Sequence, residues 1–248
     1  MSDTILEVKN VTKHFGGLTA LREVTLSLSK GQIKSIIGPN GAGKTTLFNI
    51  ISGVYSPDEG DILFEDRAIG GKSPETVCHL GVARTFQVVK PFINMSVLDN
   101  VVIGALALTS RISEARAKAM EVLDYIGMKE SAALPANSVT LEDLKRLELG
   151  RALATHPRLI LLDEVMAGLT PTETEEFIRL IRKIRDDGVT ILLIEHVMQA
   201  VLALSDEVVV LNYGEKIFEG DTHAVVRDER VIEAYLGEEY LYAQRRES

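Results

Sequence analysis

One short segment constrains the fold of this chain more than any other part of the sequence. Residues 38–45 read Gly-Pro-Asn-Gly-Ala-Gly-Lys-Thr, which fits the pattern of a glycine, four further residues and then Gly-Lys-Ser/Thr. The glycines of such a loop let successive backbone N–H groups converge on an anion. We therefore expect a nucleotide site in which Lys44 reaches the β- and γ-phosphates and the Thr45 hydroxyl binds Mg²⁺.

The residues around this loop favour a nucleotide site over an ordinary glycine-rich turn. The segment 33–37, with three isoleucines, predicts a buried strand before the loop, and residues 44–52 predict a helix that is closed by Gly53. The N-terminus of such a helix carries a partial positive charge that attracts phosphate. The predicted nucleotide-binding residues of the loop are Gly38, Pro39, Asn40, Gly41, Ala42, Gly43, Lys44, Thr45 and Thr46.

Composition and charge limit what else the chain can be. Its 248 residues are 46% hydrophobic and 25% charged, which is typical of a globular protein with a full core. The net charge of −9 disfavours nucleic acid as a partner, because binding phosphates over a broad surface takes clustered Lys and Arg. Cys78 is the only cysteine and cannot form an internal disulfide, so we expect a reducing, cytoplasmic compartment.

The sequence predicts no segment that crosses a membrane. Residues 1–4 include an acid and lack the basic flank and long apolar core of a secretory signal. The longest apolar run, 101–108, is far shorter than the roughly 18 residues that a membrane-spanning helix needs. We therefore expect any membrane association to depend on a partner.

Hydrophobic periodicity predicts two kinds of β structure. Alternating residues in 6–11 and 20–28, together with 60–69, predict an antiparallel β layer beside the nucleotide strand. Short apolar runs at 159–162, 190–194 and 208–211 return later in the chain, and a helix is predicted at 173–185 between the first two. Such an alternation of strand and helix is typical of a parallel sheet.

Between these β segments the pattern becomes helical. Residues 97–108, 113–126 and 141–154 each predict a helix, and we expect them to form an insertion at about residues 90–155. The expected fold is therefore an α/β, RecA-like P-loop NTPase core with an antiparallel β layer and an inserted helical subdomain, in a single domain spanning residues 1–248.

Two carboxylates follow the buried strand predicted at 159–162. Asp163 and Glu164 stand at the carboxyl end of that strand, which is the edge where open α/β sheets bind ligands. We expect Asp163 to hold Mg²⁺, directly or through water, and Glu164 to polarise the attacking water. A strand that ends in Asp-Glu is common by itself, so this prediction depends on the phosphate loop earlier in the chain.

Two further polar residues are candidates for the same site. His196 follows the predicted strand 190–194 and can bind the γ-phosphate or orient water, with a purely structural histidine as the alternative. Gln87 begins the helical insertion, and its amide can contact both Mg²⁺ and water, with a solvated loop amide as the alternative. The predicted catalytic residues are thus Glu164, His196 and Gln87, and the predicted magnesium ligands are Thr45, Gln87 and Asp163.

In their order along the chain these motifs resemble the nucleotide-binding subunit of an ATP-binding cassette (ABC) transporter. The resemblance covers nearly the whole chain, because the phosphate loop, Gln87, the signature region, Asp163-Glu164 and His196 follow that family's order. Within the family, the chain looks most similar to the ATPase subunits of branched-chain or hydrophobic amino-acid importers. The segments with this likeness are residues 83–87, 95–101, 166–169 and 231–237.

The resemblance implies a role for Phe15 as well as cofactors and partners. Phe15 would stack on adenine, although a buried core phenylalanine is the competing interpretation. ATP and Mg²⁺ would be the cofactors, and permease subunits, contacted through a groove near residues 87–94, would hold the protein at the inner face of the membrane. A solute-binding protein would be an indirect partner. Two cassettes would close head to tail, so that each ATP lies between one phosphate loop and the other cassette's signature.

The signature region departs from the family's usual Leu-Ser-Gly-Gly-Gln. Residues 139–143 read Val-Thr-Leu-Glu-Asp, so Leu141 and Glu142 replace glycines that let backbone approach phosphate, and Glu142 adds a negative charge. Thr140 keeps a hydroxyl, but Thr140 and Asp143 also form a capping-box pattern that starts a helix regardless of nucleotide. We therefore favour pairing with a different cassette in a heterodimer, because a homodimer would have two weak sites.

The predicted function is ATP hydrolysis that powers a membrane importer. A soluble ABC ATPase acting on DNA or ribosomes is one alternative, disfavoured because the chain has a single phosphate loop and no sustained heptads. An ATP-gated module with weak hydrolysis is another, which the altered signature suggests and Glu164 and His196 disfavour. The absence of an Asn-Lys-x-Asp segment disfavours a GTPase.

Overall fold

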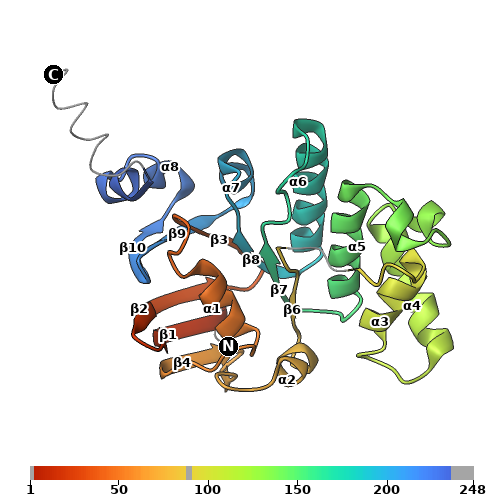
Figure 1. The fold of residues 1–248 in the computed structure, drawn as a ribbon, viewed down its shortest axis with the longest axis horizontal. Coiled ribbons are helices and arrows are strands. Elements are labelled where there is room, and N and C mark those ends of the chain that lie inside the picture. Colours follow the sequence, from red (N-terminus) through yellow and green to blue (C-terminus); the bar gives the residue numbers. More distant parts are fainter. Residues whose placement is uncertain (1–2, 88–90, 236–248) are drawn as a thin grey trace.

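Two β-sheets organise the molecule in the computed structural model, which describes residues 3–87 and 91–235 (Figure 1). The larger sheet has the strand order β10-β9-β3-β8-β7-β6, and the smaller one has the order β2-β1-β4-β5. The predicted α/β fold with an antiparallel β layer is confirmed. Parts of the segments 87–94 and 231–237, which were singled out from the sequence, lie outside the described residues.

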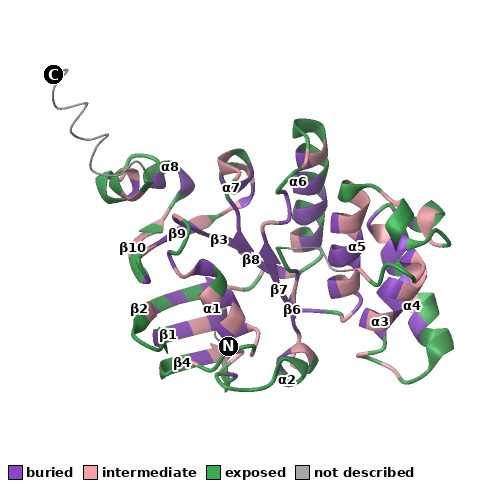
Figure 2. Cartoon of the chain, in the orientation of Figure 1, coloured by how far each residue is buried: buried purple, intermediate pink, exposed green. Residues whose placement is uncertain are grey.

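Fully buried strands form the centre of the larger sheet. β3 (Ile33–Ile37), β7 (Leu159–Asp163) and β8 (Thr190–Ile194) are buried along their whole length (Figure 2). The outer strands are β6 (Val82–Arg84), β9 (Glu207–Asn212) and β10 (Glu215–Gly220), of which β10 is antiparallel to its neighbour. Because both faces of the central strands are covered, β7 and β8 are apolar almost throughout instead of alternating. β3 reads Ile-Lys-Ser-Ile-Ile, and its buried Lys34 pairs with Glu207 and Glu219.

The register of the parallel strands aligns three carboxyl ends. Ile36 of β3 and Asp163 of β7 both pair with Ile194 of β8. The phosphate loop, Glu164 and Glu195 directly follow these three strands, so they leave the sheet at one edge. This edge is where the sequence predicts the nucleotide site.

The antiparallel layer consists of β1 (Thr4–Phe15), β2 (Leu18–Ser29), β4 (Glu59–Phe64) and β5 (Arg67–Ala68). The predicted β segment 60–69 contains two strands, because Glu65 and Asp66 turn the chain with φ angles of 47° and 61°. β1 and β2 are longer than predicted, since their pairing continues to Phe15 and Leu18 beside the connecting turn.

Helices cover both faces of the larger sheet. α1 (Lys44–Ile51) packs between the two sheets, in one hydrophobic cluster with Leu161 and Leu192. The alternate residues Ile160 and Ile191 face the other side and join the cluster that contains the buried face of α6. The remaining helices of this part of the chain are α2 (Pro74–His79), α6 (Pro171–Asp186), α7 (Met198–Leu204) and α8 (Thr222–Val225).

Three helices occupy one side of the molecule and lie between β6 and β7 in the chain (Figure 1). They are α3 (Val97–Ala105), α4 (Ile112–Tyr125) and α5 (Leu141–Leu153), which begin and end within a few residues of the predicted ranges. Short 3₁₀ turns at Lys129–Ser131 and Ala136–Ser138 connect α4 to α5. α3 and α5 pack so closely that a Cβ at Gly104 would lie 2.2 Å from the carbonyl oxygen of Arg151.

Candidate active site

The phosphate loop has a backbone that requires glycine at two positions. Gly38 has a φ of 146° and Gly43 has a φ of 101°. A Cβ at Gly38 would lie 2.0 Å from the carbonyl oxygen of Leu211, and one at Gly43 would lie 2.6 Å from that of Ala20. The loop is therefore packed directly against β9 and β2, where a side chain at either glycine would not fit.

Lys44 is the first residue of α1 and lies inside the loop. Its Nζ donates hydrogen bonds to the carbonyl oxygens of Gly38 at 2.7 Å and Pro39 at 2.9 Å. Burial lowers the pKa of Lys44, and the nearby carboxylates of Glu164 and Asp163 oppose that shift. The N-cap glycine offers no side-chain bond to the first N–H groups of α1, so these groups can bind an anion.

A cleft of about 460 Å³ opens over the loop and collects most of the predicted site residues. The predicted residues that line it are Phe15, Asn40, Gly41, Ala42, Gly43, Lys44, Thr45, Thr46, Gln87 and Glu164. Phe15 is 42% exposed and packs edge to face on Tyr55, with ring centroids 5.2 Å apart. The alternative of a buried core phenylalanine is therefore wrong, and Phe15 offers a ring surface to a ligand in the cleft.

Glu164 is in contact with both other side chains that were predicted to be catalytic. Gln87 Nε2 donates to Oε2 of Glu164 at 2.7 Å, and His196 Nε2 lies 2.8 Å from Oε1. The backbone of Glu164 has a φ of 50°, and its carbonyl oxygen accepts a hydrogen bond of 3.1 Å from the buried Lys145 of α5. Side-chain and backbone contacts thus fix the position of this carboxylate at the edge of the cleft.

Asp163 ends β7 with one carboxylate oxygen paired and the other unpaired. Oδ2 accepts a hydrogen bond of 2.9 Å from Nη2 of Arg84. Oδ1 is buried and has no hydrogen-bond partner in the described part of the chain. Burial raises the pKa of Asp163, and the Arg84 guanidinium partly offsets this. A buried, unpaired carboxylate oxygen suits a bound cation or one of its water ligands.

The three predicted magnesium ligands face one space beside the cleft. Thr45, Gln87 and Asp163 line a cavity of about 590 Å³, and the first two also line the nucleotide cleft. Among residues 3–87 and 91–235, no group of three or more His, Cys, Asp and Glu side chains is placed to hold a metal by itself. Mg²⁺ usually takes one or two carboxylates together with phosphate and water, so the residues present fit an ion that binds with a nucleotide.

Three contributions to this region were not predicted from the sequence. Tyr213, which is 87% exposed, lines the cleft from the β9–β10 turn, and the next residue, Gly214, donates a hydrogen bond of 3.1 Å to the Ala42 carbonyl. Arg84 lies within a segment used for the family resemblance, but no role was assigned to it. Glu195 is buried and accepts a hydrogen bond of 2.8 Å from the Met166 N–H, and its burial raises its pKa.

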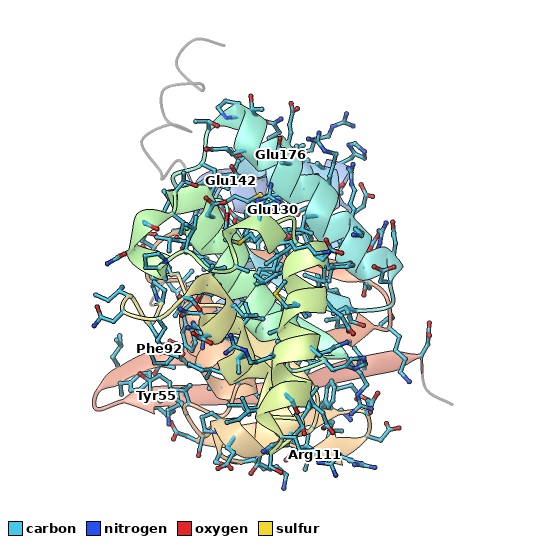
Figure 3. All side chains as sticks on the ribbon, turned by 90° about the vertical axis from the view of Figure 1, so that its right-hand side faces the viewer. Tyr55, Phe92, Arg111, Glu130, Glu142 and Glu176 are labelled. Carbon is cyan, nitrogen blue, oxygen red and sulfur yellow. The ribbon has the colours of Figure 1, made fainter. Side chains whose placement is uncertain are left out.

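The signature region does not line the cleft of its own chain. Thr140 and Asp143 form the predicted capping box, with hydrogen bonds of 3.1 and 3.3 Å, and thereby begin α5. Arg146 pairs with Glu142 at 2.6 Å and with Glu176 of α6 at 2.9 Å, and Figure 3 shows both glutamates on neighbouring helices. Arg146 therefore only partly offsets the charge that Glu142 adds to this region, because it is shared with Glu176.

Comparisons with known proteins point to one family. Residues 21–167 match the family model described as "ABC transporter", and residues 215–240 match "Branched-chain amino acid ATP-binding cassette transporter". The chain is 39% identical to the high-affinity branched-chain amino acid transport ATP-binding protein LivG of Escherichia coli K12, over 96% of this chain and 100% of that protein. It is 38% identical, with the same coverage, to the similarly named BraF of Pseudomonas aeruginosa.

Solved structures agree with these sequence matches. A nucleotide-free ATP-binding cassette from an ABC transporter has a TM-score of 0.88 at 33% sequence identity. The match covers 95% of this chain and 100% of that cassette. The ADP conformation of such a cassette has a TM-score of 0.87 at 33% sequence identity, and the match covers 96% of this chain and 100% of that cassette. A dimeric cassette in a post-hydrolysis state with ADP and Pi has a TM-score of 0.79 at 25% identity, covering 88% and 99%. Among the helices of residues 3–87 and 91–235, none combines the length and the apolar character that a membrane span requires.

Proposed function

Because this chain belongs to the ABC transporter ATP-binding proteins, a family that hydrolyses ATP to power transport, we propose that its cleft binds ATP with Mg²⁺ and that Glu164 activates the attacking water. The observation that supports this most directly is the Glu164 carboxylate held between Gln87 and His196 beside the phosphate loop. The carboxylate lies at the edge of the cleft, where it can accept a proton from water.

The roles of the other residues follow from their positions. The loop N–H groups and Lys44 neutralise the phosphates, and Phe15 stacks on the adenine ring. Thr45 and Asp163 would hold Mg²⁺, which when bound neutralises charge on the β- and γ-phosphate oxygens. His196 and Gln87 keep the Glu164 carboxylate oriented towards water, so the main contributions to catalysis are positioning and charge stabilisation.

The transport function extends this proposal to a solute and to membrane partners. The curated relatives are named for branched-chain amino acid transport, so branched-chain or other hydrophobic amino acids are the proposed solutes. Permease subunits would hold the chain at the inner face of the membrane, with a solute-binding protein as an indirect partner. We assign α3, α4 and α5 to a helical subdomain of about residues 90–155 within a single domain. The groove between this subdomain and the core would transmit the motion.

The second cassette is proposed to be a different chain. Residues 139–143 contain no glycine, and the exposed side chain of Leu141 occupies a position where the family's usual signature brings backbone to phosphate. This chain would therefore supply a complete phosphate loop but an impaired signature. The direct test compares ATP turnover of the purified chain alone with turnover after mixing with the cassette encoded beside it. Equal rates would count against a heterodimer.

The assignment of the site is tested by separating ATP binding from turnover. Glu164→Gln should retain MgATP binding and lose nearly all phosphate release, whereas Lys44→Ala should weaken binding itself. Glu75→Gln, at an exposed glutamate of α2, controls for the loss of a surface carboxylate. If Glu164→Gln turned over ATP at the parental rate, Glu164 would not be the catalytic base. If the parent with its permease bound ATP but released almost no phosphate, the ATP-gated alternative would be favoured.

A further inference from the structure

A buried arginine outside the predicted set of site residues contacts the proposed magnesium site. Arg84 ends β6, and its side chain is only 6% exposed. Nη2 donates a hydrogen bond of 2.9 Å to Oδ2 of Asp163. This contact occupies one oxygen of the carboxylate and leaves Oδ1, which is buried and has no partner in the described part of the chain.

The other side of the same guanidinium contacts α1. Nη1 donates to Oδ1 of Asn49 at 2.6 Å and to the Ser52 hydroxyl at 3.2 Å. The guanidinium carbon also lies 5.0 Å from the ring centroid of Phe86 and 5.7 Å from that of Phe48. Hydrogen bonds at both terminal nitrogens and two nearby rings restrict the orientation of this group, while its buried Nε has no hydrogen-bond partner in the described part of the chain.

These contacts connect the two elements that bear the proposed magnesium ligands. Asn49 stands four residues after Thr45, so both side chains project from the same face of α1. Thr45, Asn49, Arg84 and Asp163 line one cavity. A single side chain therefore holds the helix that carries Thr45 against the strand that carries Asp163.

We propose that Arg84 is a positioning residue for magnesium: it holds Oδ2 of Asp163 so that Oδ1 faces the ion or its water, and it fixes the spacing between Asp163 and Thr45. This inference rests on the proposed function, because it concerns the same MgATP site. A lysine cannot reproduce the role, since a single ammonium lacks the planar fork that reaches Asp163 and Asn49 together. The residues that surround a metal ligand commonly set metal affinity in this way.

The experiment measures magnesium dependence without turnover. In a Glu164→Gln background, ATP binding is measured in EDTA and then during a Mg²⁺ titration, for the parent, Arg84→Lys and Arg84→Met. We expect nearly unchanged ATP affinity in EDTA and a half-saturating Mg²⁺ concentration that rises about 10- to 100-fold, the usual cost of removing such a contact. Arg158→Lys is the matched control, because Arg158 also pairs with a carboxylate, that of Glu65, and lies over a ring, that of Phe64.

Two further measurements separate positioning from a purely structural role. In an Asp163→Asn background, Arg84→Lys should produce a much smaller change in magnesium dependence, because only its effect on the position of Thr45 remains. If Arg84→Met does not fold, Asn49→Leu removes one anchor of the guanidinium and should raise the half-saturating Mg²⁺ concentration severalfold.

The outcomes also distinguish this inference from the proposed function. A parent that shows no effect of Mg²⁺ on ATP binding would overturn the magnesium site and this inference with it. A parent that responds to Mg²⁺, with folded Arg84 variants that respond at the same concentration, would overturn the positioning role alone. A lower melting temperature with unchanged magnesium dependence would assign Arg84 to stability only.

Discussion

The Nε2 atom of His196 lies 2.8 Å from Oε1 of Glu164, and the other carboxylate oxygen accepts a hydrogen bond of 2.7 Å from Gln87. Removing either contact should reduce turnover while ATP binding persists. A hydrogen bond to a charged group is worth about 1.5–3 kcal/mol. Gln87→Ala should therefore lower kcat by about ten- to a hundredfold, and His196→Ala by about a hundredfold or more.

Turnover kinetics and equilibrium ATP binding check this prediction together. Because both side chains act through Glu164, their effects should not add: in a Glu164→Gln background, neither substitution should lower the residual rate much further. A full additional loss in that background would show that His196 or Gln87 acts independently of Glu164.

The shape of the phosphate loop predicts a sharp difference between glycines. Gly43→Ala should destabilise the protein by about 2 kcal/mol or more, because its Cβ would meet the Ala20 carbonyl oxygen at 2.6 Å and its φ is 101°. Gly70 is the matched control, since a Cβ there meets its nearest atom at an ordinary 3.6 Å. Gly70→Ala should change the unfolding free energy by no more than about 0.5 kcal/mol.

Urea denaturation of the two alanine variants tests this comparison. ATP binding should be lost in Gly43→Ala even where the protein is folded, because the substitution displaces the loop backbone. Equal stability of the two variants would show that the loop relaxes around a side chain at this position.

The fold was predictable from the sequence where the local hydrophobic pattern matches the burial of the element in the structure. The buried strands β7 and β8 appear in the sequence as apolar runs bounded by polar residues, because both of their faces are covered. β3 was predicted from its three isoleucines, although Lys34 and Ser35 are also buried in it. β6 and α7 were not predicted, since each is short and its sequence shows no clear periodicity. Their positions are set by pairing and packing with distant segments, such as that of Arg84 with Leu161.

The site was predictable to the extent that motifs mark strand ends. Asp163 ends β7, Glu164 follows it, and His196 lies two residues after the end of β8, so the parallel register brings them near the phosphate loop. The role of the signature region could not be predicted in this way, because the same residues can form a capping box or a signature. The contacts within this chain confirm only the capping box at the start of α5. The place of Tyr213 was not predictable, because it depends on a hairpin packing against the loop.

Thr140 caps α5 and also stands in the signature region, and these two possible roles lead to a further prediction. Thr140→Ala removes the side-chain bond to the Asp143 N–H and should lower the unfolding free energy by about 1 kcal/mol. Ser96→Ala is the control, because Ser96 caps α3 through an equivalent bond to Asp99. If Thr140 only caps α5, both variants should show the same ATPase activity per folded molecule in the complex with the second cassette. A selective loss in Thr140→Ala would indicate a contact with nucleotide.

The burial of Glu148 leads to a prediction of how the free energy of unfolding depends on pH. It is buried on α5, and one of its oxygens accepts a hydrogen bond of 2.9 Å from the Phe86 N–H. Burial raises the pKa of Glu148, and the nearby Asp163 raises it further, while the Phe86 N–H, Arg151 and Lys145 act in the opposite direction. The folded protein therefore binds this proton more tightly than the unfolded chain does, so ionisation of Glu148 removes stability as the pH rises.

Glu148→Gln should keep the acceptor for the Phe86 N–H and remove this penalty. Below the pKa of an unfolded glutamate, about 4.3, wild type and variant should have similar stability. As the pH rises from the unfolded to the folded pKa of Glu148, the variant should become more stable than wild type, by about 1.4 kcal/mol for each pH unit between the two pKa values.

Urea denaturation from pH 4 to pH 8 measures this difference in stability, with Glu229→Gln as a control for the loss of a surface carboxylate. A stability difference that stays constant with pH, or that favours wild type as the pH rises, would show that the surrounding cations outweigh the cost of burying this carboxylate.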